Sequence, residues 1–294
     1  MSDGLGYRRA PSISGGGRAP AAPGPLRWPR QPNRKSTSHA FLLDADDDLA
    51  QELDPRTRLA ARQIVTARVL DADAGECDPA PWFDAVLDGP GLLILDGLVA
   101  LETRVGDRTA SELLGTGDLV QPPTGRTDDL LERIDGWRVL CPTRFALLDA
   151  EFADRVRPCP QIVQALLRRA GRRIADVDAL RAITCQPRLE MRLVLLLWHL
   201  AARWGRVEPA GIRLSLPLTH RLLGHLVAAE RPSVSHALAR LARSGLVNGP
   251  ADDLHLCGSL EHHLEALTER VSAPSSQEPT HSAPNGRRAG GKVA

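Results

Sequence analysis

The side chains best suited to chemistry are grouped between Thr219 and Leu241, in the run THRLLGHLVAAERPSVSHALARL. Arginine, histidine and hydroxyl groups in this run carry hydrogen-bond donors that can reach base edges in a DNA groove or the phosphates beside it. The candidate set is Thr219, Arg231, Pro232, Ser233, Ser235, His236 and Arg240. These residue types predict recognition of double-stranded DNA, and we expect no catalytic residue among them.

Two short amphipathic helices are expected to position these side chains. In each half of the run the apolar residues repeat at the spacing of one helical face. They are Leu222, Leu223, Leu226 and Val227 in the first half, and Val234, Ala237, Leu238 and Leu241 in the second. The small residues of Ala228-Ala229-Glu230 let the second helix, expected over 231–243, cross closely over the first. The pattern predicts a helix-turn-helix with a recognition helix, although an ordinary helical hairpin has the same periodicity.

A more specific signal is the run Ala229-Glu230-Arg231-Pro232-Ser233-Val234. It resembles, without a gap, the DNA-binding motif of the Crp/Fnr transcription regulators. Residues 243–247, Arg-Ser-Gly-Leu-Val, are similar to the family's exit from the recognition helix into a β-wing, and Asp253-Leu254-His255-Leu256 resembles the return strand.

The resemblance bears on three of the candidates. Arg231 matches the family's first base-reading arginine, which can donate two hydrogen bonds to guanine O6 and N7. Pro232 stands where many members have a glutamate, and His236 where a second arginine is common. The side chains of Thr219, Ser233 and Arg240 are themselves suited to hold phosphates. The departures at Pro232 and His236 predict a preferred DNA site different from that of the best-known members.

Composition sets the class of protein. The chain has 294 residues, a formal net charge of +1 and no basic excess, so charge on its own does not indicate nucleic acid. Five separated cysteines without a CxxC pair, and no secretory signal, predict free thiols and a cytoplasmic location. The longest apolar run, residues 193–202, is too short to span a bilayer, so no membrane partner is expected.

Residues 40–157 are expected to form an antiparallel β-barrel (jelly roll), because short apolar runs alternate there with Gly and Asp turns. Asp96-Gly97 is predicted to turn a hairpin between runs 92–95 and 98–105. Segment 41–70 is predicted to be helical, with Asp54 as N-cap before Pro55. The stretches 92–101, 112–118 and 141–149 resemble the family's sensor domain, a cyclic-nucleotide-binding-like barrel.

The ligand of this sensor is unknown from the sequence. In nucleotide-binding members a Gly-Glu pair holds the ribose, and an arginine followed by a small hydroxyl residue holds the phosphate. Here the corresponding residues are Gln121-Pro122-Pro123-Thr124-Gly125 and Asp135-Gly136-Trp137. An aspartate repels a phosphate, so we expect no cyclic nucleotide bound in the family's manner and no cofactor. Trp137 is expected in the core or in the vacated pocket.

Residues 160–184 are predicted to form one long helix. Its apolar residues step by three or four, and they are Val163, Leu166, Ala170, Ile174, Val177 and Leu180. A seam this narrow is typical of coiled-coil pairing, and the resemblance implies a dimer helix here, while packing on the chain's own barrel is the alternative. Pro187 is expected to end this helix, and residues 188–205 to form a hydrophobic helix of the DNA-binding domain.

The predicted fold class is α+β, with a sensor barrel at 40–157, a dimerisation helix at 158–186, a winged helix-turn-helix at 187–260, and disordered tails at 1–38 and 272–294. His199 is expected to be a satisfied core histidine. No metal site is expected, because Cys257, His255, His262 and His263 fit no standard zinc spacing.

The predicted function is a homodimeric transcription regulator that reads a near-palindromic operator. Double-stranded DNA, a second copy of the chain and an unknown small-molecule effector are its expected partners, and RNA polymerase is left open. No enzyme motif supports catalysis. The alternative is a ligand-binding or protein-interaction module that no longer reads a specific DNA sequence.

Overall fold

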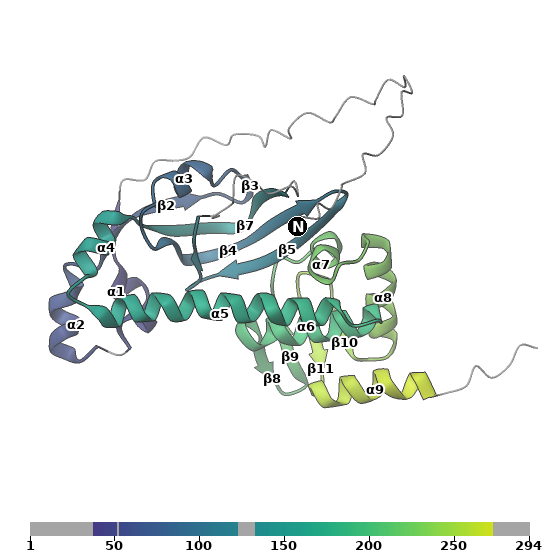
Figure 1. Cartoon of the computed structure of the whole chain (residues 1–294). Coiled ribbons are helices and arrows are strands. Elements are labelled where there is room, and N and C mark those ends of the chain that lie inside the picture. The colour runs from purple at the N-terminus through teal and green to yellow at the C-terminus, as the bar shows by residue number, and fades with distance from the viewer. Residues whose placement is uncertain (1–37, 52, 123–132, 273–294) are drawn as a thin grey trace, which may run out of the picture.

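The computed structural model describes residues 38–51, 53–122 and 133–272. Residues 1–37 and 273–294, which are all but one residue of each predicted disordered tail, lie outside the described residues, as do Pro123, Thr124 and Gly125 of the sensor loop. An N-terminal sheet and a C-terminal helical domain lie along one long helix, α5 (Pro160–Thr184) (Figure 1). Within the described part of the chain, no helix is long and apolar enough to cross a membrane.

The N-terminal sheet has seven antiparallel strands. They are β1 (His39–Phe41), β2 (Thr66–Ala72), β3 (Gly75–Cys77), β4 (Gly91–Val105), β5 (Arg108–Gly115), β6 (Leu119–Val120) and β7 (Arg133–Leu148). The pairing order is β1-β2-β7-β4-β5, with β3 on β7 and β6 on β4. The antiparallel sheet is confirmed, but the expectation of a closed barrel is wrong, since among the described residues β1 and β5 remain separate ends of the sheet.

Asp96-Gly97 does not turn a hairpin as predicted. Strand β4 runs through it, because Asp96 pairs with Arg144 and Leu98 with Cys141 on the same neighbouring strand. Gly97 has φ +106°, and a Cβ there would lie 2.3 Å from Thr143 Oγ1. The glycine therefore makes a β-bulge, and the hairpin turn lies at Gly106-Asp107 instead, between β4 and β5.

Segment 41–70 is only partly helical. It contains α1 (Leu42–Ala45), the 3-10 helix η1 (Asp47–Ala50) and α2 (Pro55–Arg62). The Asp54 cap is confirmed, because its carboxylate accepts hydrogen bonds from the backbone N–H groups of Arg56 and Thr57. Beyond α2 the prediction is wrong, since residues 66–72 form β2 with alternating burial and pair with β7.

One face of the sheet is filled by aromatic side chains. Trp137 is buried, and its ring centroid lies 5.5 Å from Phe83, 5.8 Å from Phe145 and 6.3 Å from Trp82. Trp82 belongs to α3 (Ala80–Asp84), which packs on β4. Trp137 is therefore a core residue, the first of the two positions expected for it.

Helix α5 follows α4 (Ala150–Val156) and has two different apolar faces. Leu166 is buried in the sensor core, and Leu180 packs on the core of the C-terminal domain. The outward face carries Val163, Leu167 and Ile174, with exposed fractions of 41%, 66% and 65%. The predicted seam is thus partly wrong, because it included two inward residues and omitted Leu167.

The C-terminal domain combines four helices with a four-stranded antiparallel sheet. Its elements are α6 (Leu189–Trp204), β8 (Arg206–Glu208), β9 (Gly211–Leu214), α7 (His220–Val227), α8 (Arg231–Arg243), β10 (Val247–Asn248), β11 (Leu254–Cys257) and α9 (Leu260–Ser272). The sequence pattern predicts no helix over residues 260–272, yet α9 forms there and packs on α6 (Figure 1). The β10-β11-β9 pairing gives the return strand expected of the wing.

Candidate nucleic-acid interface

Helix α7 is the first helix of the motif and buries the predicted face. Leu222, Leu223 and Val227 are buried, together with Gly224 and Leu226. Thr219 is the N-cap residue, and its Oγ1 accepts a hydrogen bond of 3.1 Å from the backbone N–H of Leu222. Thr219 is exposed, and the hydroxyl proton remains available for an outside acceptor.

The turn between the helices depends on two unusual backbone positions. Ala228 ends α7 in the left-handed region, with φ +54°. At Gly224 a Cβ would lie 2.5 Å from the carbonyl oxygen of Ala229, so a larger residue would force the helices apart. The small residues expected in the turn do allow this close crossing. Gly224, one turn earlier, is the residue that sequence reasoning missed, and its place on the apolar face was the available signal.

Helix α8 begins at Arg231 and ends at Arg243, as predicted. Pro232 lies in its first turn, where the lack of an N–H group costs no hydrogen bond. Val234, Ala237, Leu238 and Leu241 are buried beneath the helix.

Three candidate side chains lie on the solvent face of α8. Arg231, Ser233 and His236 are exposed. Across the described ranges, none of these three side chains makes a hydrogen bond or an ion pair. They are therefore open to an outside partner.

Two other candidates are engaged within the domain. Ser235 Oγ lies 2.7 Å from His220 Nδ1 and 3.1 Å from the carbonyl oxygen of Arg231, so it ties α8 to α7. Arg240 forms an ion pair with Glu190 of α6 and is half-exposed. Reading these contacts from sequence was not possible, because both partners lie on other helices.

The wing is held by charge. Asp253 accepts two hydrogen bonds from the guanidinium of Arg213, at 2.8 and 2.7 Å, and one of 2.6 Å from the Ser215 hydroxyl. These hydrogen bonds, first of all that of Arg213, hold the pKa of Asp253 well below its usual range. The ion pair fixes β9 beside the start of β11.

Two histidines of the C-terminal domain, His263 and His199, differ in burial. His263 is fully buried, and its Nε2 donates to the Cys257 carbonyl at 2.7 Å while Nδ1 accepts from Trp198 Nε1 at 3.3 Å. Burial lowers its pKa. His199 is not a satisfied core histidine as expected, since it is half-buried and its Nε2 lies 3.8 Å from an Asp176 oxygen on α5. Among the described residues, no group of His, Cys, Asp and Glu side chains has the arrangement of a metal site.

The sensor and the helix-turn-helix share one hydrophobic core. Leu98, Ala100 and Leu113 of the sheet belong to the same buried cluster as α6 and α7. The tip of the β4–β5 hairpin reaches the turn of the motif, where Arg108 pairs with Glu230. Arg203 of α6 adds an ion pair of 2.8 Å with Asp118. The helix-turn-helix is therefore docked on the N-terminal sheet of the same chain.

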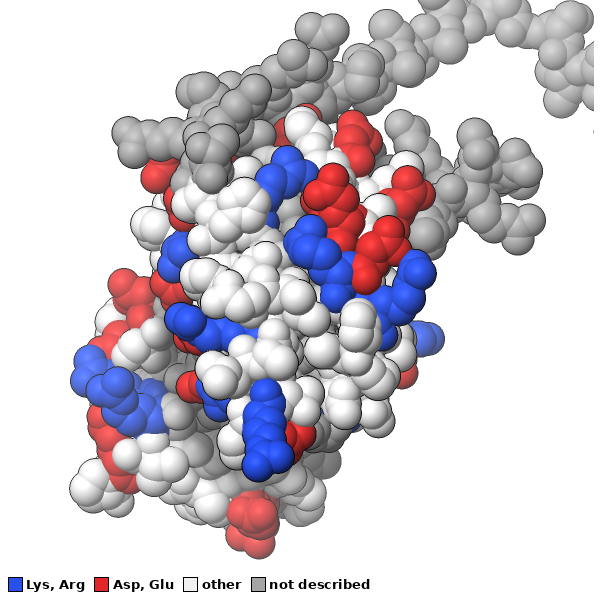
Figure 2. Space-filling view, turned by 90° about the vertical axis from the view of Figure 1, so that its left-hand side faces the viewer, with Lys and Arg blue, Asp and Glu red and all other residues white. Residues whose placement is uncertain are grey.

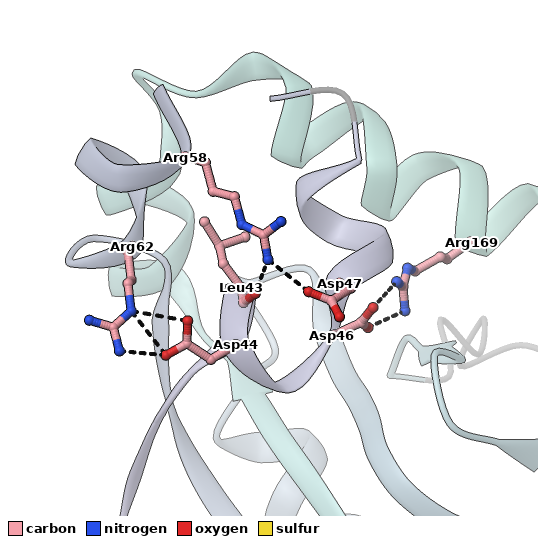
Figure 3. A network of polar contacts seen from close by, with 7 residues as sticks. All are labelled: Leu43, Asp44, Asp46, Asp47, Arg58, Arg62 and Arg169. Carbon is pink, nitrogen blue, oxygen red and sulfur yellow. Dashed lines mark hydrogen bonds and ion pairs between the residues drawn. The ribbon is translucent and has the colours of Figure 1, made fainter. Parts of the chain in front are cut away.

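The opposite end of the sensor shows a different use of charge. On the face in Figure 2, which looks onto this end, basic and acidic side chains lie in small adjacent groups. Figure 3 shows three ion pairs at this end, Arg62 with Asp44, Arg58 with Asp47, and Arg169 with Asp46. The Arg169–Asp46 pair is buried, and Arg169 also donates to the Gly117 carbonyl at 2.8 Å. Of the three pairs, the one at Arg169 binds α5 to the sensor, and each of the three arginines that Figure 3 labels has an acidic partner.

Comparisons with known proteins agree with this arrangement. A family model for the Crp-like helix-turn-helix domain matches residues 191–256. No curated protein matches the chain. A solved cyclic nucleotide-binding domain containing protein from Listeria monocytogenes EGD-e is 14% identical, with a TM-score of 0.53, over 64% of this chain and 88% of that one.

Two further solved structures have a TM-score of 0.51. A CooA mutant from Carboxydothermus hydrogenoformans is 17% identical over 68% of this chain and 87% of that one. FixK2 from Bradyrhizobium japonicum is 12% identical over 68% of this chain and 96% of that one. At these identities the likeness is one of fold. Residues 191–256 are thus similar to Crp-like helix-turn-helix domains, and the chain shares with these solved structures a fold of antiparallel sheet, long helix and C-terminal helix-turn-helix domain.

Proposed function

We propose that the protein is a homodimeric transcription regulator that reads a near-palindromic operator with α8. The observation that carries the proposal is the outer face of α8, where Arg231, Ser233 and His236 are exposed and have no partner in the described chain. They lie within a segment that matches the Crp-like helix-turn-helix domain. A helix of this kind places its N-terminal residues against base edges in the major groove.

The proposed contacts follow from what each side chain can still donate. Arg231 donates two hydrogen bonds to guanine, and His236 makes a shorter contact further along α8. Thr219 and Ser233 bind phosphates through their hydroxyl groups. Pro232 sets the start of α8, and Ser235 positions it through His220. Arg240 reaches a phosphate only by giving up or sharing its ion pair with Glu190.

The outward stripe of α5 supports the homodimer. We define this stripe as Val163, Leu167, Ala170, Ile174 and Val177, which follow one another at alternating intervals of four and three residues. That repeat is the a/d pattern of a two-stranded coiled coil. Leu167 and Ile174 are about two-thirds exposed in the single chain, which is unusual for large apolar side chains and is relieved by pairing with a second α5.

The sensor is proposed not to bind a cyclic nucleotide in the family's manner. The Asp135-Gly136-Trp137 segment offers a carboxylate and a buried indole where relatives place an arginine and a hydroxyl group.

DNA-site selection with the purified full-length chain tests the proposal. We expect enrichment of an inverted repeat whose half-sites lie about one helical turn apart, roughly 10 base pairs centre to centre. Recovery of random sequence only, from protein that sedimentation shows to be folded and dimeric, would instead favour the alternative of an interaction module without specific DNA readout.

A further inference from the structure

A cavity of about 290 Å³ lies where the sensor, α5 and the helix-turn-helix meet. Its walls come from β4, β5, α5 and α7, which converge in Figure 1. The apolar lining residues are Leu101, Ala110, Val177, Leu180, Leu226 and Ala228. The volume is close to the lower end of the range for small-molecule sites, roughly 300 Å³. Leu101 of this lining also packs against the aromatic cluster around Trp137, which fills one face of the sheet.

Several polar groups in the lining are already committed to other partners. Thr103 donates its hydroxyl proton to Asp135 at 2.7 Å, and Thr184 donates to the Arg181 carbonyl at 2.8 Å. The carboxylate of Glu112 accepts two hydrogen bonds of 2.9 Å from Arg173. These groups therefore have little left to offer a ligand, and Glu112 is charge-neutralised.

The remaining polar groups are donors. Arg181 is largely exposed at the cavity mouth, and its ion pair with Asp178 is long, at 3.4 Å. His225 faces Ser111 through Nδ1 at 3.4 Å, which leaves Nε2 for another partner. When the Ser111 hydroxyl donates to Nδ1, the ring proton resides on Nε2. The hydrogen-bond donors that remain for a ligand are then the Arg181 guanidinium and the His225 Nε2–H, both beside an apolar wall.

We propose that this cavity binds a compact apolar monocarboxylate. The carboxylate accepts hydrogen bonds from Arg181 and His225, and the apolar body lies against Leu180 and Leu226. A guanidinium–carboxylate contact is charge-assisted and so selects the anion over a neutral ligand of equal size. Because the walls belong to the sensor, α5 and α7, the bound anion holds the three together.

This site goes beyond the proposed function and does not depend on it, since binding is measured without DNA. Val177 belongs to the stripe of α5, and Arg181 lies four residues beyond it, so the cavity lining borders the proposed dimer seam.

Calorimetric titration of the full chain with cyclohexanecarboxylate, and with cyclohexanemethanol as its neutral counterpart, tests the proposal. We expect the carboxylate to bind about tenfold more tightly than the alcohol. Arg181→Gln should abolish that preference, whereas Arg172→Gln, an exposed arginine elsewhere on α5, should leave it intact. Equal affinities for the two probes, or a preference that survives Arg181→Gln, overturns the proposal.

Methyl NMR of the same samples locates the site. Shifts on adding the carboxylate should be concentrated on Val177, Leu180 and Leu226 and should vanish in Ala110→Trp, which fills the cavity. Where Ala110→Trp does not fold, the methyl shifts of the unmodified chain decide the question. Shifts elsewhere only, or no saturable binding of either probe, refute it.

Discussion

Three arginines that bind within the sensor differ from the exposed arginine at the start of α8. In the sensor, Arg138 binds Glu76 and Glu102, Arg169 binds Asp46 within the core, and Arg173 binds Glu112 from α5. On α8, Arg231 is exposed and, among the described residues, has no such partner. The paired sensor arginines are satisfied within the fold, whereas the guanidinium of Arg231 presents unsatisfied donors to the outside of a packed helix.

The difference is between arginines that are paired inside the fold and an arginine that is open to an outside partner. A guanidinium whose hydrogen bonds are satisfied inside the fold stabilises an arrangement and is unavailable to a ligand. An exposed arginine at the first turn of a packed helix is open to an outside partner, and we propose recognition as its role because binding residues are typically held on a rigid scaffold. The formal net charge of +1 does not indicate which arginines are paired and which are exposed.

The largest effect is expected from breaking the buried pair in the sensor. Arg169→Ala leaves the Asp46 carboxylate buried without its partner, and this should lower the free energy of unfolding by about 3–5 kcal/mol. Chemical denaturation of the purified chain measures it. The matched control is Arg157→Ala, which removes an exposed pair with Asp154 and should change stability very little. Equal losses in the two variants would mean that burial does not distinguish these arginines.

The next effect concerns the stripe on α5. Ile174→Asp puts a carboxylate into the proposed coiled-coil seam, and we expect the dimer to dissociate on the order of 100-fold more readily. Ala175→Asp introduces the same charge one residue away, at an exposed position off the stripe, and should leave the dimer intact. Analytical ultracentrifugation over a dilution series separates them. A dimer that tolerates both substitutions would place the interface elsewhere.

A smaller effect is expected in the pH dependence of stability, where His263 and His236 of the same domain should differ. His263 is neutral and buried in the fold, with a pKa lowered by burial, whereas His236 is exposed. The unfolded chain therefore binds a proton more readily at His263. Its contribution to stability is present above about pH 6.5 and is lost as the pH falls below that value. His263→Gln should flatten this loss in thermal unfolding between pH 7 and 5.5, while His236→Gln should not; identical slopes would argue against the assignment.

The sequence carries most of the information for the helix-turn-helix. Apolar spacing and the Arg-Pro-Ser-Val run predict α7 and α8 because both helices bury one face and are joined by a short turn. The Asp54 cap is equally local, since its hydrogen bonds reach only three residues along the chain. Contacts of this range can be predicted from neighbouring residues in the sequence.

The predictions that were wrong or incomplete concern residues whose contacts lie far away in the sequence. Gly97 looks like a turn residue, yet β7 holds the chain on both sides of it and makes a bulge. Leu166 and Leu167 both suit an apolar seam, and only the position of the sensor core decides which one faces inward. The engagement of Ser235 by His220 and of Arg240 by Glu190 likewise depends on helix packing.

The central claim is that α8 reads DNA through Arg231, and the most direct test is a binding titration on the selected operator. Arg231→Ala should weaken specific binding by about 1–3 kcal/mol and relax the preference at one base pair of each half-site. Arg206→Ala, an exposed arginine on β8, should retain both affinity and preference. Unchanged affinity and unchanged sequence preference in Arg231→Ala would contradict the account.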